Sequence, residues 1–99
     1  MPEIPNDLLE QLCRLVKQLR EESADFREHH EDAQQWYNRG YANGMLRGLQ
    51  RVLTQDCPCE QTLDDDMLLQ GHEVMAWGKA YRHGEQMGEQ ETYEICRVK

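Results

Sequence analysis

The sequence predicts an all-α fold, and three observations carry that prediction. Apolar residues recur every three or four positions in three stretches of the chain, which is the spacing of one helix face. Small residues four positions apart occur in two of these stretches, and a Cys-Pro-Cys segment at 57–59 makes the clearest break between them. We therefore predict one small domain over residues 1–99, a three-helix antiparallel bundle with Gly-xxx-Gly helix crossings.

The first helix is predicted over about residues 7–22, after a tail at residues 1–6. Asp7 followed by Glu10 resembles a capping box, and Pro5 keeps the helix from starting earlier. The apolar stripe of this helix comprises Leu8, Leu12, Leu15, Val16 and Leu19.

The second helix is predicted over about residues 25–54, with Asp25 and Glu28 again at capping-box spacing. Its stripe comprises Phe26, Ala33, Tyr37, Tyr41, Gly44, Gly48 and Val52. A heptad-spaced series leaves open a single long helix through the first two segments, made of Leu12, Leu19, Phe26, Ala33 and Gly40. We favour two separate helices.

The third helix is predicted over about residues 65–90, after a Cys-Pro-Cys loop at 55–63. Thr62, Asp64 or Asp65 can cap this helix, and aspartates suit the positive end of its dipole. Its expected face comprises Met67, Gly71, Val74, Gly78, Tyr81, Gly84 and Gly88. Residues 92–99 form a tail that alternates apolar and polar positions, which we interpret as a frayed helix end rather than a strand. A bundle of two long helices and one short helix is the alternative description of this arrangement.

A nine-residue pattern of small residues occurs twice, at 40–48 and at 80–88, so that the copies are offset by 40 positions. Each glycine inside a helix costs about 1 kcal/mol relative to alanine, so tight packing against another backbone has to compensate. We expect the helix contact at Gly40, Tyr41, Gly44, Gly48, Tyr81, Gly84 and Gly88. These residues either join the two helices within one chain or form the seam of a homodimer, and we expect a homodimer because the core is small.

The charge of the chain argues against direct binding to nucleic acid. The net charge is −8 and the pI is about 4.9, so the surface repels phosphate and attracts a basic protein. No apolar run approaches the length of a membrane span, and the N-terminus lacks the order of a secretory signal. We therefore expect a cytoplasmic protein whose four cysteines are reduced thiols.

No motif in the sequence predicts catalysis, and no cofactor is expected. Cys57 and Cys59 offer a weak alternative as zinc ligands, but no CxxC pair or matching histidine spacing completes a four-ligand site. His72 and Glu73 begin like a metalloprotease motif, yet Ala76 stands where the second histidine belongs. We expect a protein that is not an enzyme and holds no metal.

Our leading hypothesis is a non-enzymatic inhibitor or adaptor that binds a basic, nucleic-acid-binding protein through acidic helical surfaces. The expected partner-binding residues are Glu28, Glu31, Asp32, Asp64, Asp65 and Asp66. Small size and strong negative charge suit a phage-type anti-defence factor in the host cytoplasm.

Two other functions remain open at this point. The first is a helical oligomer that binds a nucleotide-like anion through Asn43, Arg47 and Arg51, together with Tyr41 and Tyr81. The second is a small zinc or thiol protein built on the two cysteines of the Cys-Pro-Cys loop.

Overall fold

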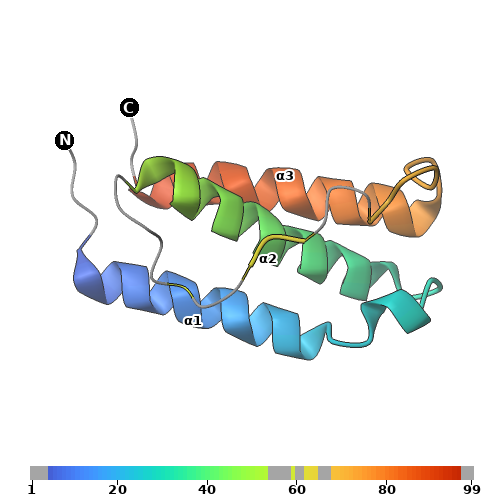
Figure 1. Ribbon diagram of the computed structural model, residues 1–99, viewed down its shortest axis with the longest axis horizontal. Helices are drawn as coiled ribbons and strands as arrows, with labels where there is room; N and C mark the ends of the chain where they lie inside the picture. Colours follow the sequence, from blue (N-terminus) through green and yellow to red (C-terminus); the bar gives the residue numbers. More distant parts are fainter. Residues whose placement is uncertain (1–4, 54–58, 60–61, 65–67, 97–99) are drawn as a thin grey trace.

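The computed structural model of the chain describes residues 5–53, 59, 62–64 and 68–96. In these residues it contains the helices α1 (Asn6–Glu22), α2 (Ala33–Val52) and α3 (Ala76–Cys96), with a short 3-10 helix η1 (Phe26–Glu28) between the first two (Figure 1). The described residues include no strand, which confirms the all-α prediction. Residues 1–4 of the predicted tail at 1–6 and the last three residues, 97–99, lie outside the described residues, and α1 already begins at Asn6.

Helix α1 agrees with the predicted first helix. Leu12 and Val16 are buried on its inner face, and Arg20 lies one turn further along the same face. The helix ends at Glu22, and the next residue, Ser23, caps it: its backbone N–H and side-chain Oγ both donate to the carbonyl oxygen of Leu19. Leu15, which the apolar stripe also contained, is 39% exposed.

The chain turns between α1 and α2, so the two predicted helices are separate and the single long helix is wrong. The second helix begins at Ala33 rather than near Asp25, because Asp32 provides the cap: its carboxylate accepts a hydrogen bond from the backbone N–H of Gln35 at 3.2 Å. Phe26 is buried in the turn, with its ring edge-on to Trp36 at 4.7 Å.

Helices α2 and α3 run in the same direction, so the predicted antiparallel pair is wrong. Gly40 lies against Tyr81, and Gly44, one turn later in α2, lies against Glu85, one turn later in α3. Figure 1 shows the same arrangement: α2 and α3 extend side by side in parallel, and only α1 runs opposite to them. The connection at 53–75 therefore has to return along the length of the bundle before α3 can begin.

Two glycines of each helix lie against the backbone of the other helix. A Cβ at Gly40 or Gly44 would overlap the carbonyl oxygen of Tyr81 or Glu85, and a Cβ at Gly84 or Gly88 would overlap a carbonyl oxygen of α2. The contacts are reciprocal: Gly40 lies against Tyr81, while Gly84, 44 positions after Gly40, lies against Tyr37, 44 positions before Tyr81. In the helix contact, a residue of α2 is thus equivalent to the residue 44 positions later in α3. This offset is one helical turn longer than the 40 positions that separate the two copies of the sequence pattern.

This arrangement bears on the predicted homodimer. All five helical glycines of the expected contact are buried within one chain, so they do not supply a seam between two chains. The homodimer stays a prediction, but the glycines that first suggested it are used for contacts within one chain.

Helix α3 begins later and ends later than predicted. Residues 68–75 form turns instead of the predicted first part of the helix, with Gly71 at a positive φ of 78°. Val74, expected on the inner face, is 77% exposed. At the other end the helix continues to Cys96, so the described part of the predicted tail is helical, with Thr92 buried.

Two groups of buried side chains form the core. One joins Leu12 and Val16 of α1 to residues of α2 and to Cys96, near the end of the molecule where Figure 1 places both chain termini. The other is aromatic and combines Phe26, Trp36, Trp77 and Tyr81 with Leu69 of the connection. In the part of the chain that the structure describes, no helix has the length and apolar character that a membrane span requires.

We expect Gly44→Ala to destabilise the fold by about 1–3 kcal/mol, because the added methyl group would force α2 away from the backbone of α3. Gly48→Ala is the matched control, since a Cβ there would lie 3.1 Å from the Thr92 side chain and 3.4 Å from the Glu89 carbonyl oxygen, so it is less crowded than a Cβ at Gly44 and gains helix propensity. Urea unfolding of both variants measures the difference. Equal stabilities would contradict the close backbone contact at Gly44.

Candidate functional site

The candidate site is a buried polar cluster around the carboxylate of Asp64, where the connection meets all three helices. Arg39 of α2 binds this carboxylate with two hydrogen bonds, Nε to Oδ2 at 3.0 Å and Nη2 to Oδ1 at 2.6 Å. Tyr81 of α3 donates its hydroxyl to Oδ2 at 2.6 Å, and Arg20 of α1 places Nη2 3.6 Å from Oδ1. The carboxylate is only 6% exposed, so this is a buried ion-pair network.

Asn43 connects Asp64 to a second buried carboxylate. Its side-chain oxygen accepts the backbone N–H of Asp64 at 2.7 Å, and its amide group donates to Oε2 of Glu85 at 2.8 Å. Arg47 and Arg82 also contact Glu85, at 3.3 Å and 2.9 Å. Because every side-chain donor comes from a helix, the network binds the connection to a surface that the helices build.

The surroundings of Asp64 favour its charged form. Burial alone would raise the pKa of Asp64, but the hydrogen bonds from Arg39 and Tyr81 and the charges of Arg39 and Arg20 hold that pKa below its ordinary value. Burial and the neighbouring Asp64 carboxylate raise the pKa of Tyr81, so its phenol stays protonated and acts as a donor. Burial, reinforced by Arg39, lowers the pKa of Arg20, an effect that Asp64 opposes.

The residues predicted to bind a nucleotide-like anion already contact carboxylates of the same chain. Arg47 contacts Glu85, and Arg51 binds Glu89 at 2.6 Å. Tyr41 donates to Glu91 at 2.7 Å, and burial together with this bond raises the pKa of Tyr41. The basic stripe of α2 thus lies against the acidic stripe of α3, which leaves the small-anion hypothesis without support.

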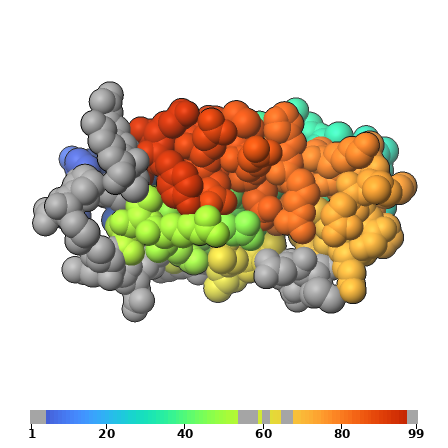
Figure 2. Space-filling model, turned by 90° about the horizontal axis from the view of Figure 1, so that it is seen from above, coloured from blue at the N-terminus to red at the C-terminus, as the bar shows by residue number. Residues whose placement is uncertain are grey.

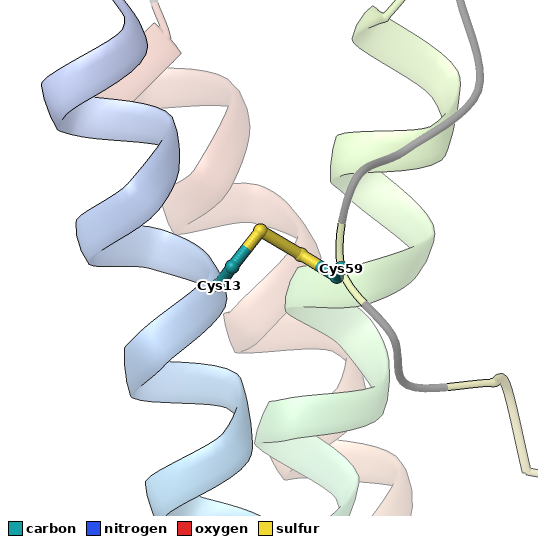
Figure 3. Close-up of a disulfide and its surroundings, with 2 residues drawn as sticks. All are labelled: Cys13 and Cys59. Atoms are coloured by element: carbon teal, nitrogen blue, oxygen red, sulfur yellow. A yellow bond between two sulfur atoms is a disulfide. The ribbon is translucent and has the colours of Figure 1, made fainter.

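Cys13 and Cys59 form a disulfide between α1 and the connection, with Cα atoms 5.3 Å apart (Figure 3). The expectation that all four cysteines are reduced thiols is therefore wrong for this pair, and Cys59 is not available as a zinc ligand. Cys57, the other proposed ligand, lies outside the described residues. Cys96 is a buried free thiol.

The predicted partner-binding residues divide into two groups. Glu28 and Glu31 are exposed beside η1, and Asp32 is half-buried as the cap of α2. Asp64 is buried in the network and does not form part of an exposed acidic surface, while Asp65 and Asp66 lie outside the described residues. Sequence reasoning treated the three aspartates alike, because nothing in their spacing separates the buried one from its neighbours.

A second cluster that sequence reasoning missed is aromatic. His30 stacks on Trp77 with ring centroids 4.4 Å apart and planes 13° apart, and His72 lies on Trp77 at 5.3 Å. Both histidines come from turns that meet at the end of the bundle opposite the termini, so only the tertiary structure brings them together.

Among the described residues, no three His, Cys, Asp or Glu side chains are arranged to hold a metal ion. Comparison with models of protein families, with curated proteins and with solved structures finds no match to this chain.

We expect loss of the disulfide to lower the free energy of unfolding by about 2–4 kcal/mol, because it closes a loop with a sequence separation of 46 residues. The variant Cys13→Ser/Cys59→Ser and the reduced wild-type protein should both show this loss in urea unfolding. Adding reductant to the double variant should change nothing further, which is the control. A count of four free thiols in the purified protein before reduction would contradict the disulfide.

We expect Asp64→Asn to lower the stability by about 3–5 kcal/mol at neutral pH, since it removes one charge from a buried pair. The folded protein holds the pKa of Asp64 below its ordinary value of 3.8, so this contribution is present above that pH and disappears as the pH falls below it. The free energies of unfolding of wild type and variant, measured from pH 7 downward, should therefore converge in acid. Glu10→Gln, which removes an exposed ion pair with Arg14, is the control and should change little. A difference that does not depend on pH would contradict the charged network.

Proposed function

We propose that this protein is a non-enzymatic inhibitor or adaptor that binds a basic surface of another protein through the acidic corner between α1 and α2. We define the acidic corner by its exposed carboxylates, Glu21, Glu22, Asp25, Glu28 and Glu31. It retains two of the residues first predicted to bind a partner, Glu28 and Glu31, and leaves out the buried Asp64.

The observation that carries this proposal is how the charges are distributed. Six arginines of the described chain contact carboxylates: Arg14, Arg20, Arg39, Arg47, Arg51 and Arg82. Five of them neutralise the buried or half-buried acids Asp64, Glu85 and Glu89. The negative charge that these contacts leave is therefore concentrated elsewhere on the surface, and the acidic corner carries five carboxylates within eleven residues.

The corner has few local cations to offset this charge. His29 lies 3.0 Å from Glu31, and hydrogen bonds from the backbone and from His29 lower the pKa of Glu31. Arg27 is exposed, with its guanidinium 5.7 Å from the ring of Phe26. Carboxylates arranged on a short, folded turn attract a basic partner from a distance and fix its orientation on contact.

An inhibitor of a nucleic-acid-binding protein is the function that best suits such a surface. A basic groove that binds phosphates also binds carboxylates, so the acidic corner would compete with nucleic acid for it. The phage-type anti-defence role remains our proposal for the biological setting.

We expect Glu28→Lys/Glu31→Lys to weaken binding to a basic peptide of alternating lysine and arginine at least tenfold, since it reverses two charges of the corner. Isothermal titration at two salt concentrations measures the affinity and its electrostatic part. Amide chemical shifts of the labelled wild-type protein should change at residues 21–31 when the peptide is added.

Glu10→Lys/Glu94→Lys is the matched control, because it reverses the same number of exposed charges away from the corner. Equal weakening by both pairs, or shift changes spread evenly over the molecule, would show that the peptide senses only net charge and would overturn the proposed surface.

A further inference from the structure

We propose that Arg20, Arg39 and Tyr81 form a binding site for a carboxylate or a similar oxyanion, and that Asp64 occupies this site as a built-in ligand. The Cys13–Cys59 disulfide holds the segment that carries Asp64, so that reduction opens the site to an external anion. This inference stands apart from the proposed function, which uses the opposite charge on another surface.

Packing contacts other than those with Asp64 also hold the donors of this site. The guanidinium of Arg39 lies over the ring of Phe26, 5.1 Å from its centroid, and Tyr81 contacts Trp36 edge-on at 6.4 Å. Arg20 is buried on α1 and is 8% exposed. Packing of the helices thus contributes to the orientation of these donors.

The donors match an oxyanion in geometry and charge. Arg39 uses the planar fork that binds two oxygens of a carboxylate or a phosphate, and Tyr81 adds a third donor to one of these oxygens. The position is buried, which strengthens each of these bonds relative to the same bonds in water.

Asp64 differs from the other residues of the site because it lies outside the helices, in the connection between α2 and α3. Thr62 and Leu63, immediately before Asp64, are exposed, so Asp64 is the inward contact of this short stretch. Five residues earlier, the disulfide joins Cys59 to α1. The segment thus has two attachments to the helices, one covalent and one made by Asp64 and its backbone N–H.

The covalent attachment, the Cys13–Cys59 disulfide, can be broken by reduction. A dithiol reductant donates two electrons and two protons, the S–S bond breaks, Cys13 and Cys59 become thiols, and the reductant becomes its own disulfide. After this step, an external anion competes with an Asp64 carboxylate whose segment has lost its covalent attachment to α1.

In the first experiment, the substitution Asp64→Ala in the whole chain removes the carboxylate that occupies the site. Sodium formate is then added, because formate is a free carboxylate of the same size as the one removed. We expect formate, but not sodium chloride at the same ionic strength, to raise the melting temperature of the variant along a saturating curve. Sodium phosphate in a parallel titration distinguishes a tetrahedral anion from a planar one. If the variant is unfolded in chloride, recovery of helix by circular dichroism on adding formate is the same readout.

The controls separate a binding site from general stabilisation. Asp64→Ala/Arg39→Lys keeps the charge but loses the fork, so the formate effect should fall at least tenfold in apparent affinity. Glu85→Ala removes the neighbouring buried carboxylate but leaves Asp64 bound to Arg39. Formate should therefore not raise the melting temperature of this variant by binding at Arg39. A formate response that is absent in Asp64→Ala, or unchanged when Arg39 is lysine, would overturn the site.

The second experiment tests the disulfide in the wild-type protein. The Nε–Hε signal of Arg39 in a nitrogen-correlated NMR spectrum reports directly on the atom that binds Asp64. We expect phosphate or formate to shift this signal in the protein reduced by a dithiol, and to leave it unmoved in the oxidised protein. An equal response in both forms would overturn control by the disulfide.

Discussion

The structure depends on the direct contact between the backbones of α2 and α3. Gly40 and Gly44 lie against carbonyl groups of α3, and Gly84 and Gly88 lie against carbonyl groups of α2. A side chain at any of these positions would overlap the opposite helix, so the close contact in the observed relative direction requires glycine there. That direction is parallel, which a short hairpin cannot produce, and the chain therefore needs a long return segment.

The return segment brings together the polar residues of the candidate site. It passes from the end of α2 back to the start of α3, crosses α1 at the disulfide of Cys59, and places Asp64 where the three helices meet. A buried carboxylate is costly unless several donors surround it, and here each helix supplies one. The same residues thus hold the connection in place and build a recess that recognises an oxyanion.

The distribution of charge follows from the same packing. When α2 and α3 lie side by side, Arg47 and Arg51 face carboxylates of α3, and these contacts neutralise most of the basic stripe of α2. The acids of the acidic corner instead lie in the last turn of α1 and in the segment that leads to α2. Among the described residues, the acidic corner thus groups five exposed carboxylates of a protein whose net charge is −8.

The sequence by itself determined the helical class and the extent of α1, because these features depend on the periodicity of apolar residues within one segment. It did not determine the direction of α2 and α3, since glycines four residues apart permit parallel and antiparallel contact alike. The pairing of Cys13 with Cys59 and the burial of Asp64 beside exposed neighbours were decided by the path of the return segment. These contacts join residues that are distant along the chain, so only the packed structure brings them together.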